Sequence, residues 1–440
     1  MLLLDYTNFN KSSMKESLGA PEYSYWFVRQ AFRHLLAQLG THISITDPAE
    51  EVDVIYNAAR ARGEPCVFLP FTAPNRTPLG QTCPTIPVFA WEYDTLPDES
   101  WGANPAEDWT YVLRRTGMAI THCSYAEKAV KRSMGDDFPI WVIPAPMFDK
   151  HKRASLDSKG WHKPFDLTVE GGLAIDVGAI DLTWFRPERP PIDGLGVLRA
   201  LEATSLDPRR KPQVVSLGGV IYTAVFNPHD GRKNWQDLLT GFVWAFRETP
   251  TATLIVKLTR FDVEQGIAPV LQLLSLLGPF ACRVVLIHGL LSDEAYRGLI
   301  DCTSYAVNTS YGEGQCLPLM EYMSAGRPVV APDHTAMQDY VSPDNAFVIK
   351  STPKLTHWPH DQRVVKRCMH HHISFEDLVG RYRASYRVAR DDPGRYAQMS
   401  EAAVKSLRSF CSDEVVTAQL RDVVKHVGRL GAGVERAAST

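Results

Sequence analysis

The segment 308–331 limits the fold of this chain more than any other stretch of its sequence. It reads as the end of an apolar strand, a loop in which Gly312 and Gly314 flank Glu313, a helix, a glycine and a second apolar strand. Pro318 stands where the first turn of that helix tolerates a proline. A strand, a short loop, a helix and another strand in this order predict a βαβ unit of a parallel sheet.

Apolar runs alternate with helical patterns along most of the chain, and they form two series. Strands are expected at 2–4, 52–56, 66–69, 86–91, 118–121 and 140–143, and in the second series at 214–217, 254–258, 284–287, 306–309 and 329–331. With 440 residues, and domains of about 100–200 residues, two domains are the natural number. We predict an α/β architecture of two doubly wound, Rossmann-like domains that face a cleft, because such folds bind ligands at the carboxyl ends of their strands.

Composition suggests where these domains begin and end. The N-terminal domain is expected over 1–210, with a hairpin-like insertion at about 151–205, where Lys, Arg and Pro are frequent. The proline- and arginine-rich stretch 207–212 is interpreted as the linker. The C-terminal domain is expected over 211–425, and 426–440 as a mobile tail.

Charge, cysteine content and hydropathy exclude several classes of protein. The 47 Lys and Arg residues against 50 Asp and Glu give a net charge of −3, which excludes the basic footprint of a nucleic-acid-binding protein. The eight cysteines are scattered without a Cys-x-x-Cys pair, which favours reduced thiols. No run approaches the roughly 20 apolar residues of a membrane span, and the N-terminus lacks a leader pattern. We expect a cytoplasmic protein, and peripheral contact with the inner face of a membrane is left open.

The loop around Glu313 carries the chemistry of the 308–331 segment. Its glycines let backbone amides approach a ligand, and the N-terminus of the following helix favours an anion such as a phosphate. Glu321, about one turn into that helix, is placed to accept hydrogen bonds from the hydroxyls of a ribose. Two glutamates at this spacing also occur by chance as solvated charges, so the complete string is the stronger signal.

This block resembles the Glu-x7-Glu motif of retaining glycosyltransferases with the GT-B fold, especially those of family 4. Their usual string begins Glu-Gly-Phe-Gly-Leu-Pro, and here Gln315-Cys316 replaces Phe-Gly. The resemblance implies that Glu313 lies beside the donor sugar and that Glu321 binds the nucleotide ribose. It also implies a donor-binding role for the remainder of the loop, namely Gly312, Gly314, Gln315, Cys316 and Leu317.

A second block, 225–239, is similar to the basic loop that opens the C-terminal domain of these enzymes. By resemblance, Arg232 and Lys233 neutralise the leaving diphosphate, and a solvated basic turn is the alternative. Lys257 ends a strand and either faces the phosphates or is a surface charge. In the N-terminal half, 90–94 stands where many members carry a histidine near the sugar. Glu92 or Asp94 is therefore a candidate for contact with the sugar or the acceptor, against the alternative of a solvated turn.

The predicted activity is transfer of a hexose or deoxyhexose, with a mannose or rhamnose type favoured, from a GDP-, UDP- or dTDP-sugar to a hydroxyl of a glycan or lipid-linked glycan. Retention of configuration and a role in surface polysaccharide or O-antigen synthesis follow from the resemblance alone. No tightly bound cofactor and no metal are expected, since Arg232, Lys233 and a helix N-terminus can neutralise the diphosphate. The adjacent His370, His371 and His372 are interpreted as a polar loop, not as a metal site. The alternatives are a GT-B-type nucleotide-sugar epimerase and a catalytically silent glycan-binding subunit.

Overall fold

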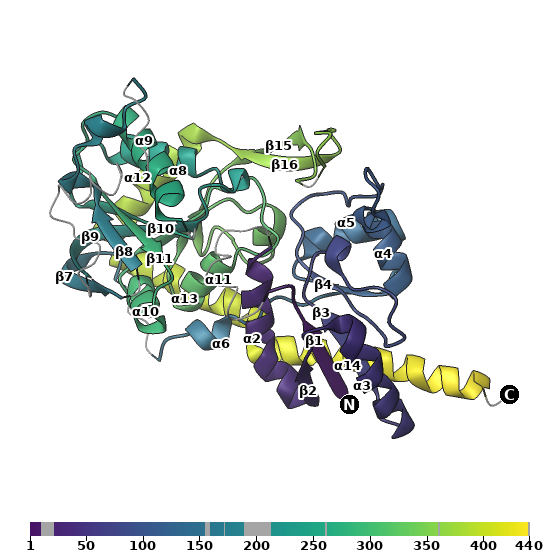
Figure 1. The fold of residues 1–440 in the computed structure, drawn as a ribbon. Coiled ribbons are helices and arrows are strands. Elements are labelled where there is room, and N and C mark those ends of the chain that lie inside the picture. The colour runs from purple at the N-terminus through teal and green to yellow at the C-terminus, as the bar shows by residue number, and fades with distance from the viewer. Residues whose placement is uncertain are drawn as a thin grey trace.

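The computed structural model describes residues 1–9, 22–154, 159–170, 172–188, 213–259, 262–359 and 361–438. Two α/β units lie next to each other, and a long C-terminal helix runs beneath the N-terminal unit (Figure 1). The expected linker at 207–212 and the part of the expected insertion from 189 onwards lie outside the described residues.

The N-terminal unit is built on short parallel strands. One sheet has the order β2-β1-β3 and the other the order β4-β5-β6. Two isolated parallel bridges, Phe68 to Thr85 and Phe71 to Val88, join them. The strands are β1 (Leu2–Tyr6), β2 (Thr41–Ser44), β3 (Cys66–Pro70), β4 (Val88–Phe89), β5 (Ala119–Thr121) and β6 (Ile140–Val142). The helices are α2 (Ser24–Leu39), α3 (Pro48–Ala61), α4 (Trp109–Thr116) and α5 (Ser124–Met134).

One predicted strand of this unit is wrong. Residues 52–56 lie inside α3, and the strand that precedes this helix is β2. The helix has its own start signals, because the Asp47 side chain caps its first turn and Pro48 occupies its first position. Val52 and Ala59, seven residues apart, are its buried face, so the apolar run follows the helical period and not the strand period.

The C-terminal unit contains one large mixed sheet with the order β14-β13-β12-β9-β10-β11-β8, and β7 also pairs with β9. Its inner strands are parallel and are covered by helices (Figure 1). The strands are β7 (His162–Val169), β8 (Gly172–Asp176), β9 (Gln213–Phe226), β10 (Ala252–Leu258), β11 (Arg283–Gly289), β12 (Tyr305–Val307), β13 (Val329–Ala331) and β14 (Ala346–Val348). The helices between them are α8 (Trp235–Phe246), α9 (Val263–Leu276), α10 (Asp293–Asp301) and α11 (Leu317–Ser324).

The hairpin expected within 151–205 belongs to this second sheet. β7 pairs antiparallel with the first half of β9, and β8 pairs antiparallel with β11. The sequence had assigned the whole insertion to the N-terminal domain, whereas these strands extend the C-terminal sheet. The domain boundary near 210 stays a prediction, because the chain around it lies outside the described residues.

The last three helices connect the two units. They are α12 (Phe375–Asp391), α13 (Pro393–Cys411) and α14 (Asp413–Ala438). α12 packs on α8 and α13 on α11, whereas α14 crosses to α2 of the N-terminal unit. There, His34 Nε2 lies 2.8 Å from Asp413 Oδ2. α14 continues through most of the expected tail, whose mobility stays a prediction. None of the described helices is long and apolar enough to cross a membrane.

A hairpin made of β15 (Ser351–Thr356) and β16 (Cys368–Ile373) reaches from the C-terminal unit to the N-terminal unit (Figure 1). We call residues 351–373 the strap. The amide of Met369 donates to Asp94 Oδ1 over 2.7 Å, and Trp358 stacks on Trp101 with ring centroids 6.1 Å apart. His370, His371 and His372 lie on strand β16, so the prediction that they form a polar loop is wrong. Their side chains are partly buried by the neighbouring chain.

Candidate active site

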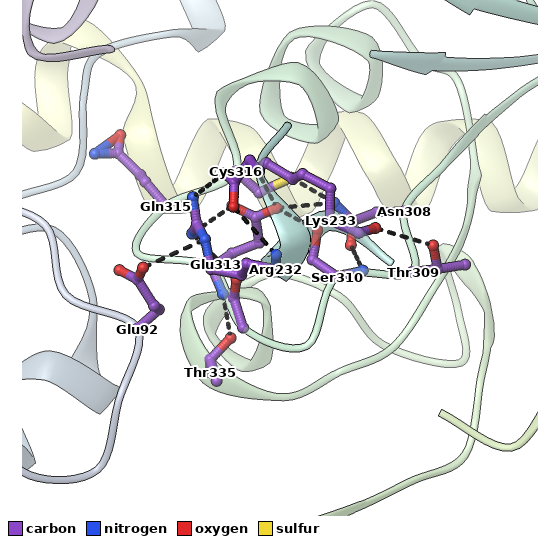
Figure 2. A network of polar contacts seen from close by, with 12 residues as sticks. Glu92, Arg232, Lys233, Asn308, Thr309, Ser310, Glu313, Gln315, Cys316 and Thr335 are labelled. Carbon is purple, nitrogen blue, oxygen red and sulfur yellow. Dashed lines mark hydrogen bonds and ion pairs between the residues drawn. The ribbon is translucent and has the colours of Figure 1, made fainter. Parts of the chain in front are cut away.

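Glu313 lies in the loop between β12 and α11, and its side chain is only 4% exposed. Lys233 reaches it from the loop after β9, and Nζ donates to Oε1 over 2.7 Å (Figure 2). Ser310 and Asn308 donate to the same oxygen over 2.6 and 3.1 Å. Because β9 and β12 are adjacent parallel strands, the loops at their carboxyl ends meet at one edge of the sheet.

The charges around Glu313 keep it ionised. Burial alone would raise the pKa of this carboxyl, but the positive charges of Lys233 and Arg232 and the hydrogen bonds to it bring the pKa below its ordinary value. Arg232 Nη1 lies 3.4 Å from Oε2 of Glu313. Glu313 is therefore a buried anion with neighbouring cations, suited to electrostatic stabilisation and not to proton donation.

Arg232 connects carboxylates of both units. Its guanidinium lies 3.0 Å from Asp230 Oδ2. It also lies 3.3 Å from Glu92 Oε1, in addition to its contact with Glu313 (Figure 2). Glu92 belongs to the loop after β4 of the N-terminal unit, and burial raises the pKa of its carboxyl. The structure thus brings together Glu92, Arg232, Lys233 and Glu313, the four residues proposed as catalytic. Their roles stay predictions.

Gly312 and Gly314 are needed where the two units touch. A Cβ on Gly314 would lie 2.8 Å from Cβ of Ala90 and 3.1 Å from the backbone nitrogen of Trp91. A Cβ on Gly312 would lie 3.1 Å from the backbone oxygen of Glu92. The sequence explained these glycines by the approach of a ligand, and the structure adds a second reason, the close packing of the 90–92 backbone.

The next three residues lead into α11. Gln315 is buried, and its Oε1 accepts a hydrogen bond from the amide of Ala145 in the N-terminal unit over 2.9 Å. Cys316 is the N-cap of α11 with a φ of 62°, a left-handed conformation that is uncommon outside glycine. Burial raises the pKa of its thiol to about 12, so the sulfur stays protonated. Leu317 is the first residue of the helix.

Glu321 lies in α11 and has contacts of its own, separate from those of Glu313. Tyr296 donates its hydroxyl proton to Oε2, and the Nε2 atom of His151 lies 4.0 Å from Oε1. Burial raises the pKa of the Glu321 carboxyl to about 7. The carboxyl is half protonated near neutral pH, and its ionised form is the stronger acceptor for the hydroxyls of a diol, so binding and ionisation are coupled.

Lys257 stands apart from the carboxylates of the cluster. It is the penultimate residue of β10, and its ammonium donates to the backbone oxygens of Leu258 and Gly289 over 3.1 and 2.5 Å. Burial lowers the pKa of this amine to about 8. The side chain is buried, so it is not a surface charge, and its predicted role toward the phosphates stays a prediction.

Several contacts of the site were missed because their partners are distant in sequence. Thr335 Oγ1 accepts a hydrogen bond from the amide of Glu313 over 3.0 Å. Asp339 of the C-terminal unit accepts from the amide of Ser124 at the start of α5 over 2.7 Å. No local pattern announces either pairing. Within the described part of the chain, no group of three His, Cys, Asp or Glu residues could hold a metal ion.

Comparison with solved structures gives the fold. Anabaena HepE, solved in complex with UDP and glucose, is 13% identical at a TM-score of 0.53, and the match covers 97% of this chain and 100% of HepE. Sucrose-phosphate synthase from Thermosynechococcus elongatus is 13% identical at a TM-score of 0.51, with 97% and 99% covered. S. aureus TarM is 10% identical at a TM-score of 0.49, with 81% of this chain but only 55% of TarM covered. The matches to HepE and sucrose-phosphate synthase support the GT-B fold, as the sequence predicted.

The class of protein follows from a match in sequence. Residues 269–356, which include Glu313, Glu321 and Thr335, match the family model described as Glycosyl transferases group 1. The expected enzyme class, a glycosyltransferase, is confirmed at this level. No curated protein matches this chain in sequence.

Proposed function

We propose that this chain is a retaining, family 4-type glycosyltransferase that transfers a hexose or deoxyhexose from a nucleotide diphosphate sugar to a hydroxyl of a glycan. The observation that carries the proposal is the buried Glu313 carboxylate in contact with Lys233 and Arg232, one loop before the N-terminus of α11. Glu321 follows within the same helix, so sugar, diphosphate and ribose would each meet one part of a continuous segment.

The proposed chemistry uses these charges directly. The bond between the anomeric carbon and the phosphate oxygen breaks, the acceptor oxygen bonds to the same face of that carbon, and the acceptor proton passes to the leaving phosphate. Lys233 and Arg232 neutralise the diphosphate, so a metal is not required. The ionised Glu313 accepts hydrogen bonds from the sugar and stabilises the positive charge that develops on it. Glu92 lies 3.3 Å from Arg232 and comes from the N-terminal unit, which we propose binds the acceptor.

The donor is proposed to be a UDP-sugar in the first place, since HepE was solved with UDP and glucose. GDP- and dTDP-linked mannose- or rhamnose-type sugars are the next to test. The acceptor is proposed to be a glycan or lipid-linked glycan of surface polysaccharide or O-antigen synthesis. The cytoplasmic location and the peripheral membrane contact stay predictions.

The test starts with nucleotide binding and continues with transfer. Thermal shifts with UDP, GDP, dTDP, ADP and CMP, with and without magnesium, select the donor base. Transfer from the matching sugar nucleotide is then compared in wild type, Glu313→Gln and Glu376→Gln, which changes an exposed carboxylate on α12. Loss of the Glu313 charge should lower kcat by about 100-fold or more with nucleotide binding retained, whereas the control should match wild type.

Each other outcome points elsewhere. Equal kcat in wild type and Glu313→Gln would refute the role of Glu313. Conversion of the donor sugar without any acceptor would identify an epimerase. An absence of binding to every nucleotide would favour a silent glycan-binding subunit. An inverted anomeric product would remove the assignment to a retaining family.

A further inference from the structure

Backbone strain is concentrated around Glu313. Of the described residues, five other than glycine have a positive φ, and three of these adjoin the contacts of Glu313. Asn234 follows Lys233, Cys316 Sγ accepts a hydrogen bond from Asn308, and Thr335 contacts Glu313 itself. Residues held in sparsely populated backbone regions cluster at functional sites, because the surrounding structure must maintain them against their own preference.

Thr335 is the most unfavourable of the three. Its φ is 53°, and a β-branched side chain in the left-handed region is a genuine outlier, whereas asparagine enters this region far more readily. A glycine would adopt the same backbone without strain. Thr335 is 1% exposed, so the side chain is not there for contact with solvent.

The hydroxyl of Thr335 contacts two backbone groups, and the Nδ1 atom of His334 lies 3.4 Å from it. The hydroxyl donates its proton to the backbone oxygen of His334 over 2.7 Å, which leaves a lone pair for the amide of Glu313 at 3.0 Å. The neighbouring amide of Ala336 donates to the backbone oxygen of Glu313 over 3.1 Å. Both polar backbone groups of Glu313 are therefore bound by one short segment.

The strap supports this segment from the other side. The ring of His371 stacks on that of His334 with centroids 4.5 Å apart and an interplanar angle of 15°. The amide of His371 also donates to the backbone oxygen of Tyr311, two residues before Glu313, over 2.8 Å. The turn that contains Thr335 thus lies between the catalytic loop and the strap.

We propose that Thr335 is a positioning residue for Glu313. Its hydroxyl fixes the backbone of Glu313. The carboxylate therefore stays in contact with Lys233 and Arg232 while the sugar donor binds and the product leaves. The strained backbone is retained because glycine lacks the hydroxyl. The proposal rests on the proposed function for its kinetic consequence, but its structural content is independent of the reaction.

The test compares Thr335→Val, which keeps the shape and removes the hydroxyl, with Thr335→Ser, which keeps the hydroxyl. The first measurement is kcat divided by the concentration of nucleotide-binding sites, which is found by titration so that unfolded protein is not counted. The second is amide hydrogen exchange in the 308–316 segment. Thr335→Val should lower kcat about 10-fold or more with the nucleotide Kd unchanged and should exchange faster in this segment. Thr335→Ser should recover kcat to within about threefold.

The outcomes separate this inference from the proposed function. If wild type transfers sugar and Thr335→Val matches it in kcat and exchange, the inference is overturned while the function stands. Equally poor kcat in both variants would also overturn it, since the hydroxyl would then not be the feature that matters. If wild type transfers no sugar, the proposed function fails, and hydrogen exchange still decides whether the hydroxyl fixes Glu313.

Discussion

Replacing Glu321 with glutamine should make the protein more stable and, at the same time, weaken its nucleotide binding. Glutamine keeps the volume of the side chain and can still accept the hydrogen bond from Tyr296. It removes a carboxyl that is 15% exposed and whose pKa burial raises to about 7. The stability gain is expected because ionising a buried carboxyl is unfavourable, and the binding loss because ribose hydroxyls prefer a charged acceptor.

The magnitude follows from the difference in proton binding between the two states. The pKa is about 7 in the folded protein against an ordinary value of 4.5. At about 1.4 kcal/mol for each tenfold change, this is worth about 3 kcal/mol. Below the ordinary pKa the carboxyl is protonated in both the folded and the unfolded protein, and the wild-type protein has its full stability. As the pH rises through the folded-state pKa, the buried carboxyl must ionise, and the wild-type protein loses this free energy of unfolding. The advantage of Glu321→Gln should therefore grow with pH and level off at about 3 kcal/mol in mildly alkaline solution.

The assay is urea unfolding of wild type, Glu321→Gln and the surface control Glu376→Gln between about pH 5 and pH 8, with UDP affinity measured at each pH. The free energies of wild type and Glu321→Gln should converge at the acidic end and diverge at the alkaline end. Affinity for UDP should be lower in Glu321→Gln at the alkaline end. A stability difference that does not change with pH would refute the reasoning, because the buried charge would then not be its source.

Two further perturbations test the contact between the units. Gly314→Ala would place a Cβ within 2.8 Å of Ala90, so it should lower the stability of the protein by about 1–3 kcal/mol and slow transfer. Gly380→Ala on α12 meets open space and should do neither. Equal stability and transfer rates in the two variants would contradict the close packing. Trp358→Ala removes a buried side chain of the strap that stacks on Trp101, so it should accelerate amide hydrogen exchange in residues 94–101. Unchanged exchange there would show that the strap does not hold this loop.

Features with local signals were predicted well. The strands β10, β12 and β13 agree with the expected 254–258, 306–309 and 329–331 to within two residues, because the apolar run of each strand is a local signal. The strand predicted at 52–56 is wrong because a five-residue apolar run is too short to distinguish a strand from one face of a helix. Membership of β7 and β8 in the second sheet depends on pairing with β9 and β11, far along the chain, which local pattern does not record.

The candidate site divides in the same way. Glu313 was found in a local pattern of strand, glycine-containing loop and helix, and Arg232 and Lys233 were found through the resemblance of 225–239 to the basic loop of a family. Glu92 was found only through its place in a family pattern, and its contact with Arg232 depends on how the two units dock. No sequence pattern marked Thr335. Its proposed role depends on its backbone angle and on a hydroxyl that accepts a hydrogen bond from Glu313, 22 positions earlier.

The strap also determines which relative motions the two units can make. The chain crosses between them near α6 (Phe148–His151) and again at the start of α14, and the strap lies on the other side of the molecule (Figure 1). The loop around Glu313 adds a third attachment between the units, because Gln315 accepts a hydrogen bond from Ala145 and Arg232 lies 3.3 Å from Glu92. Any separation of the two units must therefore break the contacts of the strap as well as those of the loop around Glu313.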